Sequence, residues 1–469
     1  MVVKNRLLFG ARLGLRISRE YFWHDIKVDN IDLGDYSGPP NGKDSLIIKE
    51  TIDIMDDDLV IGEKHDVCAT ITIDDKTIAT PALGQFIPAW PNSITLTTSK
   101  SKGDSIQLSV GRFTTTRLWF DLNNNKIMEP DEHILYYNKL AVNSQTITVH
   151  GLIKSFYCDD QQLTAIDFDN CPLIQEITCL NDEITKLDLS SCTNLTRVNA
   201  TNNKISSFVT ASTTKLTQIN LKDNNMSNFN LINQPELAVL ELDNNNITNI
   251  NVSNSPKLTS LSFLTNPTTN VNASNCVKLE KIEFNNGPLS LLNVNGCLGL
   301  SSINVKNNNL QTINYSGCKS LKTLNCENNQ LQSLDLKDLI ALEILNCSKN
   351  QLTQLDLSGN NLLKNVICSS NQLTSLDAQN CNKLTVLNCS NNQLTSLNLA
   401  NCVILGSINL EYNQLYGSNT TTIMEALPDR SGKSRGILSF AGNSGYYSAL
   451  EIANNKNWEV RDGSWTKEE

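Results

Sequence analysis

The stretch LNCSNNQLTSLNL, Leu387 to Leu399, places a cysteine between leucines and follows it with two asparagines. Two near-copies lie upstream, LNCSKNQLTQLDL from Leu345 and LNCENNQLQSLDL from Leu324. Successive starting positions of the three stretches differ by 21 and by twice that number, which predicts an internal repeat of 21 residues.

One position of the repeat marks how far it extends. Aligned on the asparagine of L-x-x-L-x-C-x-x-N-x-L, thirteen positions follow in steps of 21 without an insertion, and ten of them are asparagine. We call them the ladder positions: Gln161, Asp182, Asn203, Asn224, Asn245, Asn266, Gly287, Asn308, Asn329, Asn350, Asn371, Asn392 and Asn413. A repeat of fixed length predicts a solenoid in which each copy packs only on its neighbours.

Each copy has a simple physical interpretation. Residues 323–326 alternate polar and apolar side chains, as a short strand with one buried face does. The amide of the ladder asparagine can bond backbone groups that the following turn leaves unpaired, and a buried unpaired group costs about 1–3 kcal/mol. Aspartate and glutamine can still accept such bonds, but Gly287 cannot, so we expect repeat seven to be a weak point. The second half of each copy should return along the convex side as another short extended segment.

The fourteen cysteines resolve into two columns of the repeat. Cys158, Cys179, Cys326, Cys347, Cys368 and Cys389 share a slot that Leu, Val, Phe or Ala fills in other copies; Cys171, Cys192, Cys276, Cys297, Cys318, Cys381 and Cys402 share a second slot. Only Cys68 lies outside both. A residue that alternates with leucine and phenylalanine acts as a small apolar side chain, so we expect buried free thiols in both columns.

Metal and disulfide interpretations of these cysteines are weaker. The chain has no C-x₂-C pair, and all four histidines precede the repeats. In-register neighbours about 4.8 Å apart are also too distant for a disulfide, whose Cβ atoms lie about 3.8 Å apart.

The regions on either side of the repeats differ from them. Residues 1–150 contain alternating Ile-, Thr- and Val-rich runs such as ATITIDDKTIAT, which predict β structure. We predict a β-rich domain over 1–92, a small β unit that caps the solenoid over 93–150, the solenoid over 151–415 and a C-terminal cap over 416–469. In that last region, TTTIMEALPDR and YSALEIANNKNWEV each predict a short helix, with the strand GILSF between them.

The pattern L-x-x-L-x-L-x-x-N-x-L resembles the leucine-rich repeat. The fold class expected is therefore mostly β: a right-handed leucine-rich-repeat solenoid of about 13 repeats, preceded by small β domains and closed by a short α/β cap. ITVHGLIKSFYCDDQQLTAIDF, the LxxLxCxxNxLxxLDLS copies and ALEIANNKNWEV together resemble leucine-rich-repeat proteins of anaerobic Bacteroidetes over about 93–469. The resemblance implies a secreted or cell-surface protein that serves adhesion or recognition.

WFDLNNNKIMEPDE contains one candidate cation site. Counted from Asp121, the residues Asn123, Asn125, Ile127, Glu129 and Glu132 fall at positions 3, 5, 7, 9 and 12, the ligand spacing of an EF-hand loop. Lys126 stands where that loop normally has glycine, and the flanking residues predict strands. Two interpretations stay open, an Asn-rich hairpin loop and a Ca²⁺ site that braces the β unit; no other cofactor is expected.

No catalytic motif is present, so a non-enzymatic binding module is the leading hypothesis. A net charge of −10 disfavours nucleic acid, and no apolar run approaches the length of a membrane span. Ile344, Ile367 and Val386, in three successive repeats, should form an apolar patch on the polar concave face. The binding residues predicted there are Thr323, Asn325, Ile344, Asn346, Asn365, Ile367, Val386 and Asn388.

The partner expected is a protein on a host or bacterial surface, bound by a monomer. Two alternatives stay open: a structural surface spacer, and an effector whose activity resides in 1–92. Drift of the repeat, or packing of the C-terminal cap, would also account for the apolar patch without any ligand.

Overall fold

The computed structural model describes eight strands between residues 11 and 86, and then residues 93–112, 118–125, 138–211, 215–444 and 447–462. Residues 1–156 with 166–173 form one compact unit, and residues 157–165 with 174–469 form a second. The domain boundaries predicted at 92 and 150 stay predictions.

The first unit consists of short antiparallel strands. The first eight are β1 (Ala11–Ser18), β2 (Lys27–Val28), β3 (Ile31–Asp32), β4 (Ser45–Ile52), β5 (His65–Val67), β6 (Thr70–Ile73), β7 (Lys76–Ala79) and β8 (Gly84–Phe86). They pair as β1–β4, β2–β3, β5–β8 and β6–β7. The next are β9 (Ser93–Thr98), β10 (Ser105–Arg112), β11 (Trp119–Asp121), β12 (Asn138–Ala141) and β13 (Thr146–His150). β14 (Ile153–Tyr157) and β15 (Leu163–Asp169) each extend past the limits of this unit.

Alternation decides how β9 and β13 pack. Ile94 and Leu96 of β9 and Ile147 and Val149 of β13 are fully buried, and the two strands pair antiparallel. The predicted β character of 93–150 follows from this pattern of apolar residues at every second position.

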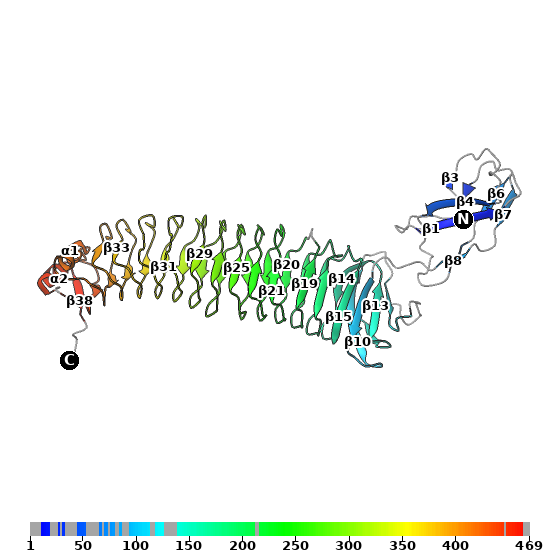
Figure 1. Ribbon diagram of the computed structural model, residues 1–469, viewed down its shortest axis with the longest axis horizontal. Helices are drawn as coiled ribbons and strands as arrows, with labels where there is room; N and C mark the ends of the chain where they lie inside the picture. The colour runs from blue at the N-terminus through cyan, green and yellow to red at the C-terminus, as the bar shows by residue number, and fades with distance from the viewer. Residues whose placement is uncertain are drawn as a thin grey trace. The chain divides into compact units, whose positions relative to one another are not determined.

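The second unit is a mostly β solenoid of about 14 turns (Figure 1). Each coil contributes one short parallel strand to the concave sheet, in register with a residue 21 positions earlier, for example Thr323 with Ile344. These strands are β16 (Glu176–Thr178), β18 (Arg197–Asn199), β20 (Gln218–Asn220), β22 (Val239–Glu241), β24 (Ser260–Ser262), β26 (Lys281–Glu283), β28 (Ser302–Asn304), β30 (Thr323–Asn325), β31 (Ile344–Asn346), β32 (Asn365–Ile367), β34 (Val386–Asn388) and β36 (Ser407–Asn409).

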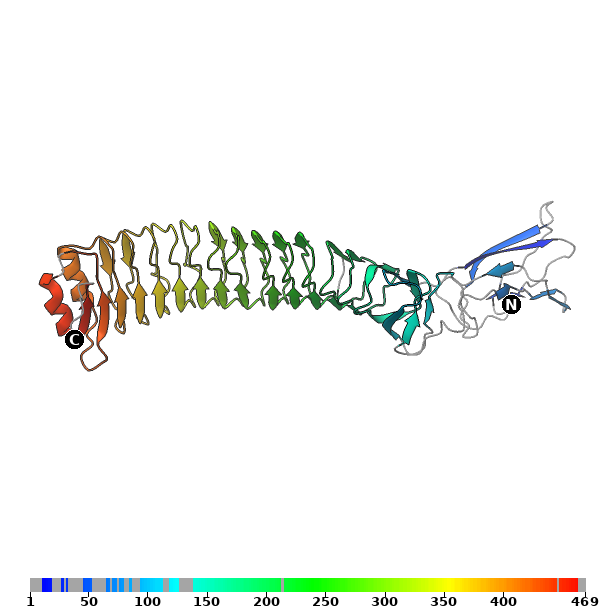
Figure 2. The ribbon, with the colours of Figure 1, turned by 90° about the horizontal axis from the view of Figure 1, so that it is seen from below.

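The return segments of the coils form an outer sheet on the opposite side (Figure 2). It comprises β17 (Lys186–Leu189), β19 (Ser207–Thr210), β21 (Asn228–Asn230), β23 (Asn249–Asn251), β25 (Asn270–Asn272), β27 (Leu291–Asn293), β29 (Thr312–Asn314), β33 (Ser375–Asp377) and β35 (Ser396–Asn398). Neither sheet is continuous. The concave sheet is interrupted between β24 and β26, and the outer sheet between β19 and β21 and again between β29 and β33.

The ladder asparagines join successive coils. Asn350 is buried, and its Nδ2 donates to the carbonyls of Cys326 (2.9 Å) and Cys347 (3.1 Å). Its Oδ1 accepts the amide of Leu331 at 3.0 Å. One side chain therefore pairs backbone groups of its own coil and of the preceding coil, the role predicted for it. The same bonds recur at the other asparagines, Asn203, Asn224, Asn245, Asn266, Asn308, Asn329, Asn371, Asn392 and Asn413.

Asp182 fills a ladder position less well. Its Oδ1 accepts the amides of Gln161 (2.8 Å) and Leu163 (3.0 Å), but its buried Oδ2 has no partner among the described residues. Burial raises the pKa of Asp182 to about 6, against the opposite effect of these two amides. A carboxylate also has no N–H with which to serve the carbonyls that Asn350 bonds.

The asparagine that precedes the ladder position has a second use. Asn181, Asn202, Asn307, Asn328 and Asn391 all have positive φ, between 54° and 56°. Asparagine tolerates this left-handed conformation better than most residues, which explains the N-N pair of the repeat. The side chains form a second row along the edge of the solenoid. For example, Asn328 Nδ2 donates to Asn307 Oδ1 at 3.0 Å.

The thirteen described cysteines are free and buried, as predicted. We call those in the concave strands' slot the strand thiols; burial raises the pKa of Cys326 to about 12, and the Cys158 thiol lies 3.7 Å from the Thr178 carbonyl. The second set, the corner thiols, is buried as predicted, but several of these thiols donate hydrogen bonds and so do not act as purely apolar side chains. Cys276, Cys297, Cys318 and Cys402 donate their S–H to a carbonyl of the preceding coil at 3.1–3.3 Å. Asn360 occupies the same slot and donates to the equivalent carbonyl of Leu336 at 3.1 Å.

The C-terminal cap contains a fourteenth coil that the sequence pattern missed. Asn443 makes the ladder bonds: its Oδ1 accepts the Leu415 amide (3.2 Å) and its Nδ2 donates to the Leu410 carbonyl (2.8 Å). The step from Asn413 is longer than 21 because helix α1 (Ser418–Ala426) is inserted. The cap then adds β37 (Gly436–Ser439), a 3₁₀ turn (Tyr447–Ala449), α2 (Leu450–Asn455) and β38 (Trp458–Arg461).

Trp458 closes this end of the solenoid. Its ring is fully buried, and its Nε1 donates to the Pro428 carbonyl at 2.9 Å. The ring lies so close to Gly436 that an added Cβ would stand 2.5 Å from it, so this position needs glycine. Arg430 stands over the ring at 5.9 Å and donates to the Leu405 carbonyl at 2.8 Å, which ties the cap to the last regular coil.

The two sets of thiols predict opposite responses to substitution. Cys297→Ser keeps a donor and should leave the urea unfolding midpoint nearly unchanged. Cys297→Val leaves the Ala273 carbonyl with only the longer bond from the Cys276 backbone amide, at 3.3 Å, and should cost about 1 kcal/mol. In the strand slot, Cys347→Val should cost below about 1.5 kcal/mol, while Cys347→Ser buries a hydroxyl at about 1–3 kcal/mol. The same ranking of serine and valine at both positions would contradict the assignment.

Candidate functional site

The eight predicted binding residues lie together on four adjacent strands of the concave sheet. Thr323 and Asn325 belong to β30, Ile344 and Asn346 to β31, and the others to β32 and β34. Thr323 pairs with Ile344, Ile344 with Asn365 and Asn365 with Val386, so one row of outward side chains crosses all four strands. Asn325, Asn346, Ile367 and Asn388 form the parallel row beside it.

The three predicted apolar residues surround Asn365. Ile344 and Val386 flank it on the neighbouring strands, and Ile367 follows it on its own strand. Ile344 is 43% exposed, and the other two are half-buried. The Oδ1 of Asn365 is buried without a hydrogen-bond partner among the described residues. We call these four residues the Asn365 cluster; it combines exposed apolar surface with an unsatisfied acceptor.

Three of the predicted residues have a structural role as well. Asn325, Asn346 and Asn388 each accept, through Oδ1, the backbone amide two residues later at 3.1–3.2 Å. Such a bond shapes the turn that leaves the strand, and it explains why asparagine recurs in this row. Ile367 replaces asparagine in the same row and cannot make that bond, so here the chain gives up a turn contact and presents an apolar side chain instead.

Charged pairs border the Asn365 cluster on two sides. Glu343 and Lys364, which precede Ile344 and Asn365, form an ion pair of 2.5 Å. The pKa of Glu343 lies below its usual value because Lys364 donates a hydrogen bond to it. On the other side, the Glu327 carboxylate accepts from Lys349 at 2.9 Å and from the side-chain Nδ2 of Asn346 at 3.2 Å. An apolar centre with a charged rim is typical of protein–protein interfaces.

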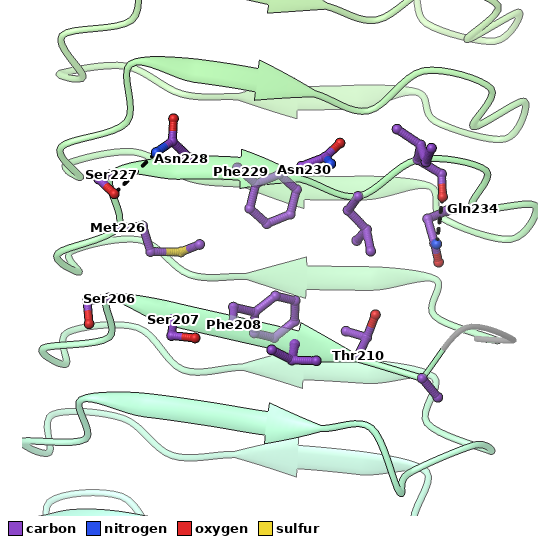
Figure 3. A pocket seen from close by; sticks show the side chains of 14 residues that line it. Ser206, Ser207, Phe208, Thr210, Met226, Ser227, Asn228, Phe229, Asn230 and Gln234 are labelled. Carbon is purple, nitrogen blue, oxygen red and sulfur yellow. Dashed lines mark hydrogen bonds between the residues drawn. The ribbon is translucent and has the colours of Figure 1, made fainter.

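A pocket in the outer sheet was not predicted from the sequence. It lies at the interruption between β19 and β21 and has a volume of about 490 Å³. Figure 3 shows the rings of Phe208 and Phe229 in the space between these strands, with Met226 beside them. The rings are nearly parallel, with centroids 6.3 Å apart. SSFVT at this coil departs from the TSLDL-like segment of other repeats, and that departure is the signal that marks the pocket.

The candidate cation loop is described only in its first half. Asp121 is fully buried at the end of β11, and its Oδ1 accepts the amide of Asn125 at 3.0 Å. Asn123 Oδ1 accepts the same amide at 2.9 Å, and Asn124 has a φ of 57°, so the chain turns sharply here. Ile127, Glu129 and Glu132 lie outside the described residues. Within the described part of the chain, no three His, Cys, Asp or Glu side chains gather as metal ligands would.

The thiols are poorly suited to nucleophilic chemistry. Burial raises the pKa of Cys192, Cys318 and Cys381 to about 11, so the reactive thiolate is scarce at neutral pH. Helices long and apolar enough to span a bilayer are absent from the described residues.

No family model and no curated protein sequence matches the chain. Among solved structures it is similar to YopM from Yersinia enterocolitica, at 20% identity and a TM-score of 0.43 over 62% of this chain and 61% of that one. YopM from Yersinia pestis, a leucine-rich effector protein, is 24% identical with a TM-score of 0.40, over 62% of this chain and 78% of that one. The functional domain of InlJ from Listeria monocytogenes, which includes a cysteine ladder, is 21% identical with a TM-score of 0.37, over 68% and 76% of the two chains.

The chain thus spans 61% of the length of the first of these structures. The likenesses concern the fold. The fold is a leucine-rich-repeat solenoid. Its own strand register and ladder bonds establish that, independently of any neighbour.

Proposed function

We propose that the protein is a non-enzymatic recognition module that binds a protein partner through the concave face around the Asn365 cluster. The observation that carries the proposal is the unsatisfied Oδ1 of Asn365 among three apolar side chains. A buried acceptor without a partner costs about 1–3 kcal/mol, and a small side-chain movement toward a donor on a ligand would recover it. Most buried polar atoms in native proteins have a hydrogen-bond partner, so an unpaired one calls for an explanation.

The bordering charges support the same proposal. Glu343–Lys364 and Glu327–Lys349 are exposed ion pairs, which contribute little to stability. They can instead orient a partner of complementary charge and exclude others. The partner proposed is a protein on a host or bacterial surface, and the chain is proposed to act outside the cell as a monomer. Protection of the chain from protease added to intact cells would contradict the external location.

Charge insertion in the cluster tests the concave-face proposal. The double variant Ile344→Glu/Val386→Glu should reduce at least tenfold the amount of partner that immobilised full-length protein retains from surface-protein extracts. A tenfold loss corresponds to about 1.4 kcal/mol, a modest cost for placing carboxylates against an apolar contact.

A matched control variant is available in Ile340→Glu/Val403→Glu. These residues have the same side chains, lie outside every strand and are 56% and 57% exposed. The control should retain the partner as the wild type does. Equal retention by the cluster variant and the control, with both folded by circular dichroism, would contradict the proposal.

We also propose that the loop 121–132 binds Ca²⁺ and braces the first unit. The buried carboxylate of Asp121 and the sharp turn at Asn124 support the proposal, because a hard cation needs oxygen ligands in a tight loop. In thermal unfolding of the full chain, the midpoint temperature of the first transition should be several degrees higher in excess Ca²⁺ than in a chelator. Asp121→Asn should abolish the shift. An unchanged wild-type midpoint would contradict the site.

A further inference from the structure

One junction between coils lacks the backbone bonds that its neighbours have. In the regular coils, the amide after each concave strand donates to the next coil: Leu242 to the Ser262 carbonyl at 2.8 Å, and Phe284 to that of Asn304 at 3.0 Å. Between these two bonds, the amide of Phe263 makes no such bond to Glu283. The whole junction lies within residues 215–444, which are described without a gap.

Two further rows of bonds stop at the same junction. The backbone amide of Asn244 donates to the Leu264 carbonyl at 2.9 Å, and that of Asn286 donates to the Lys306 carbonyl at 3.1 Å. Thr265 lies between these two residues in the row, but within 215–444 its amide makes no corresponding bond to the Asn285 carbonyl. On the other side of the strands, Thr259 donates to the Ala238 carbonyl and Ser301 to that of Glu280, each at 2.9 Å. The equivalent bond from Glu280 to Thr259 is absent from this described stretch.

The ladder is also interrupted here. Gly287 has no side chain with which to reach the preceding coil, and an added Cβ would stand 2.4 Å from the Phe284 ring. The next residue is Pro288, which lacks the amide that Asn309 uses, one coil later, to donate to the Leu289 carbonyl at 2.9 Å. Gly287, Phe284 and Pro288 together therefore remove the side-chain hydrogen bonds of the ladder position and one backbone hydrogen bond between the two coils.

The outer side of the same junction stays joined. β25 and β27 pair in register, Val271 with Leu292. Ser290 donates to the Thr269 carbonyl at 2.8 Å, Ala273 to that of Asn293 at 2.9 Å, and the Cys297 thiol to that of Ala273 at 3.1 Å. Two coils that are bonded on one side and unbonded on the other can open only about the bonded side.

The contact that remains on the concave side is an aromatic stack. The rings of Phe263 and Phe284 lie with centroids 4.9 Å apart at 21° to one another. Ring contacts are less directional than backbone ladders and tolerate sliding. This stack keeps water out of the core without fixing the angle between the coils.

We propose that the junction between β24 and β26 is a hinge, with β25 and β27 as its axis. The solenoid then consists of two stiff segments whose concave surfaces change their mutual angle as the junction opens. The Asn365 cluster lies wholly on the segment that begins at β26, so the hinge repositions the concave surface of β16–β24 relative to it. Motion at this hinge does not depend on the binding function proposed above.

Two matched pairs of spin labels test the hinge in the full-length protein. Labels at Arg197 and Thr323 stand six strands apart across the junction, and labels at Lys281 and Ser407 stand six strands apart within the unbroken sheet. The two backbone positions of each pair are separated by about 29 Å along the solenoid axis. Genetically encoded label sites avoid the buried thiols. Double electron–electron resonance should give a distance distribution at least twice as broad for the first pair, extended toward longer distances.

Repair of the junction gives the second arm. Phe284→Leu/Gly287→Asn/Pro288→Gln supplies the residues that regular coils carry at these positions, as in Leu242, Asn350 and Gln351. The repaired chain should narrow the first distribution to the width of the second. Equal widths for the two pairs in the wild type would overturn the hinge, and so would a repaired chain that folds and stays as broad. If the repaired chain does not fold, the wild-type comparison decides alone.

Discussion

The structure depends on one interaction, the bonds of a buried carboxamide between neighbouring coils. A coil of 21 residues bends sharply after its strand and leaves backbone donors and acceptors inside the molecule, away from water. Asn350 serves such groups on both sides of one bend, with Nδ2 on the carbonyls of Cys326 and Cys347 and Oδ1 on the amide of Leu331. Only asparagine offers a donor and an acceptor at this reach. The same bend must recur in successive coils for the short concave strands to stay in register and for the thiols to form columns.

Where another residue replaces asparagine at a ladder position, the effect on the concave sheet depends on how many hydrogen-bonding groups are lost. Asp182 keeps the acceptor and loses the donor, and the concave sheet continues through its coil. Gly287 loses both, and with Pro288 beside it the concave sheet is interrupted. The weak point expected at repeat seven is therefore where the sheet divides. The ring of Phe284, stacked on Phe263, occupies the space that a Cβ at position 287 would need.

Much of the fold could be predicted because periodicity encodes it directly. Leucine spacing places the strands, and the ladder positions place the bends. The fourteenth coil was missed because helix α1 lengthens the step between Asn413 and Asn443, and a fixed period cannot register an insertion. The corner thiols were interpreted as apolar by extension from the strand thiols, whose slot Leu, Val, Phe or Ala fills in other copies. Asn360 in the same slot, which makes the same bond, was the available evidence that this position needs a donor.

The candidate site shows a similar division. The apolar cluster follows from register alone, because strand neighbours in an in-register solenoid are fixed by the repeat length. The unsatisfied Oδ1 of Asn365 and the turn bonds of Asn325, Asn346 and Asn388 depend on side-chain torsions that no sequence pattern specifies. The pocket between β19 and β21 likewise arises from a missing strand pairing, which the phenylalanine and valine at Phe208 and Val209 indicate only in retrospect.

A reciprocal exchange of ladder residues tests the central claim most directly. Asp182→Asn restores the missing donor and should raise the free energy of unfolding by about 1–3 kcal/mol at pH 8. Because the pKa of Asp182 is raised to about 6, the wild type bears a buried charge above that pH and is relieved of it below. The gain should therefore be smaller at pH 5. Asn350→Asp should show the reverse, a loss on the order of 3 kcal/mol that is larger at pH 8. Urea unfolding of both variants at the two pH values would contradict the account if the changes share a sign, or if neither variant differs from the wild type.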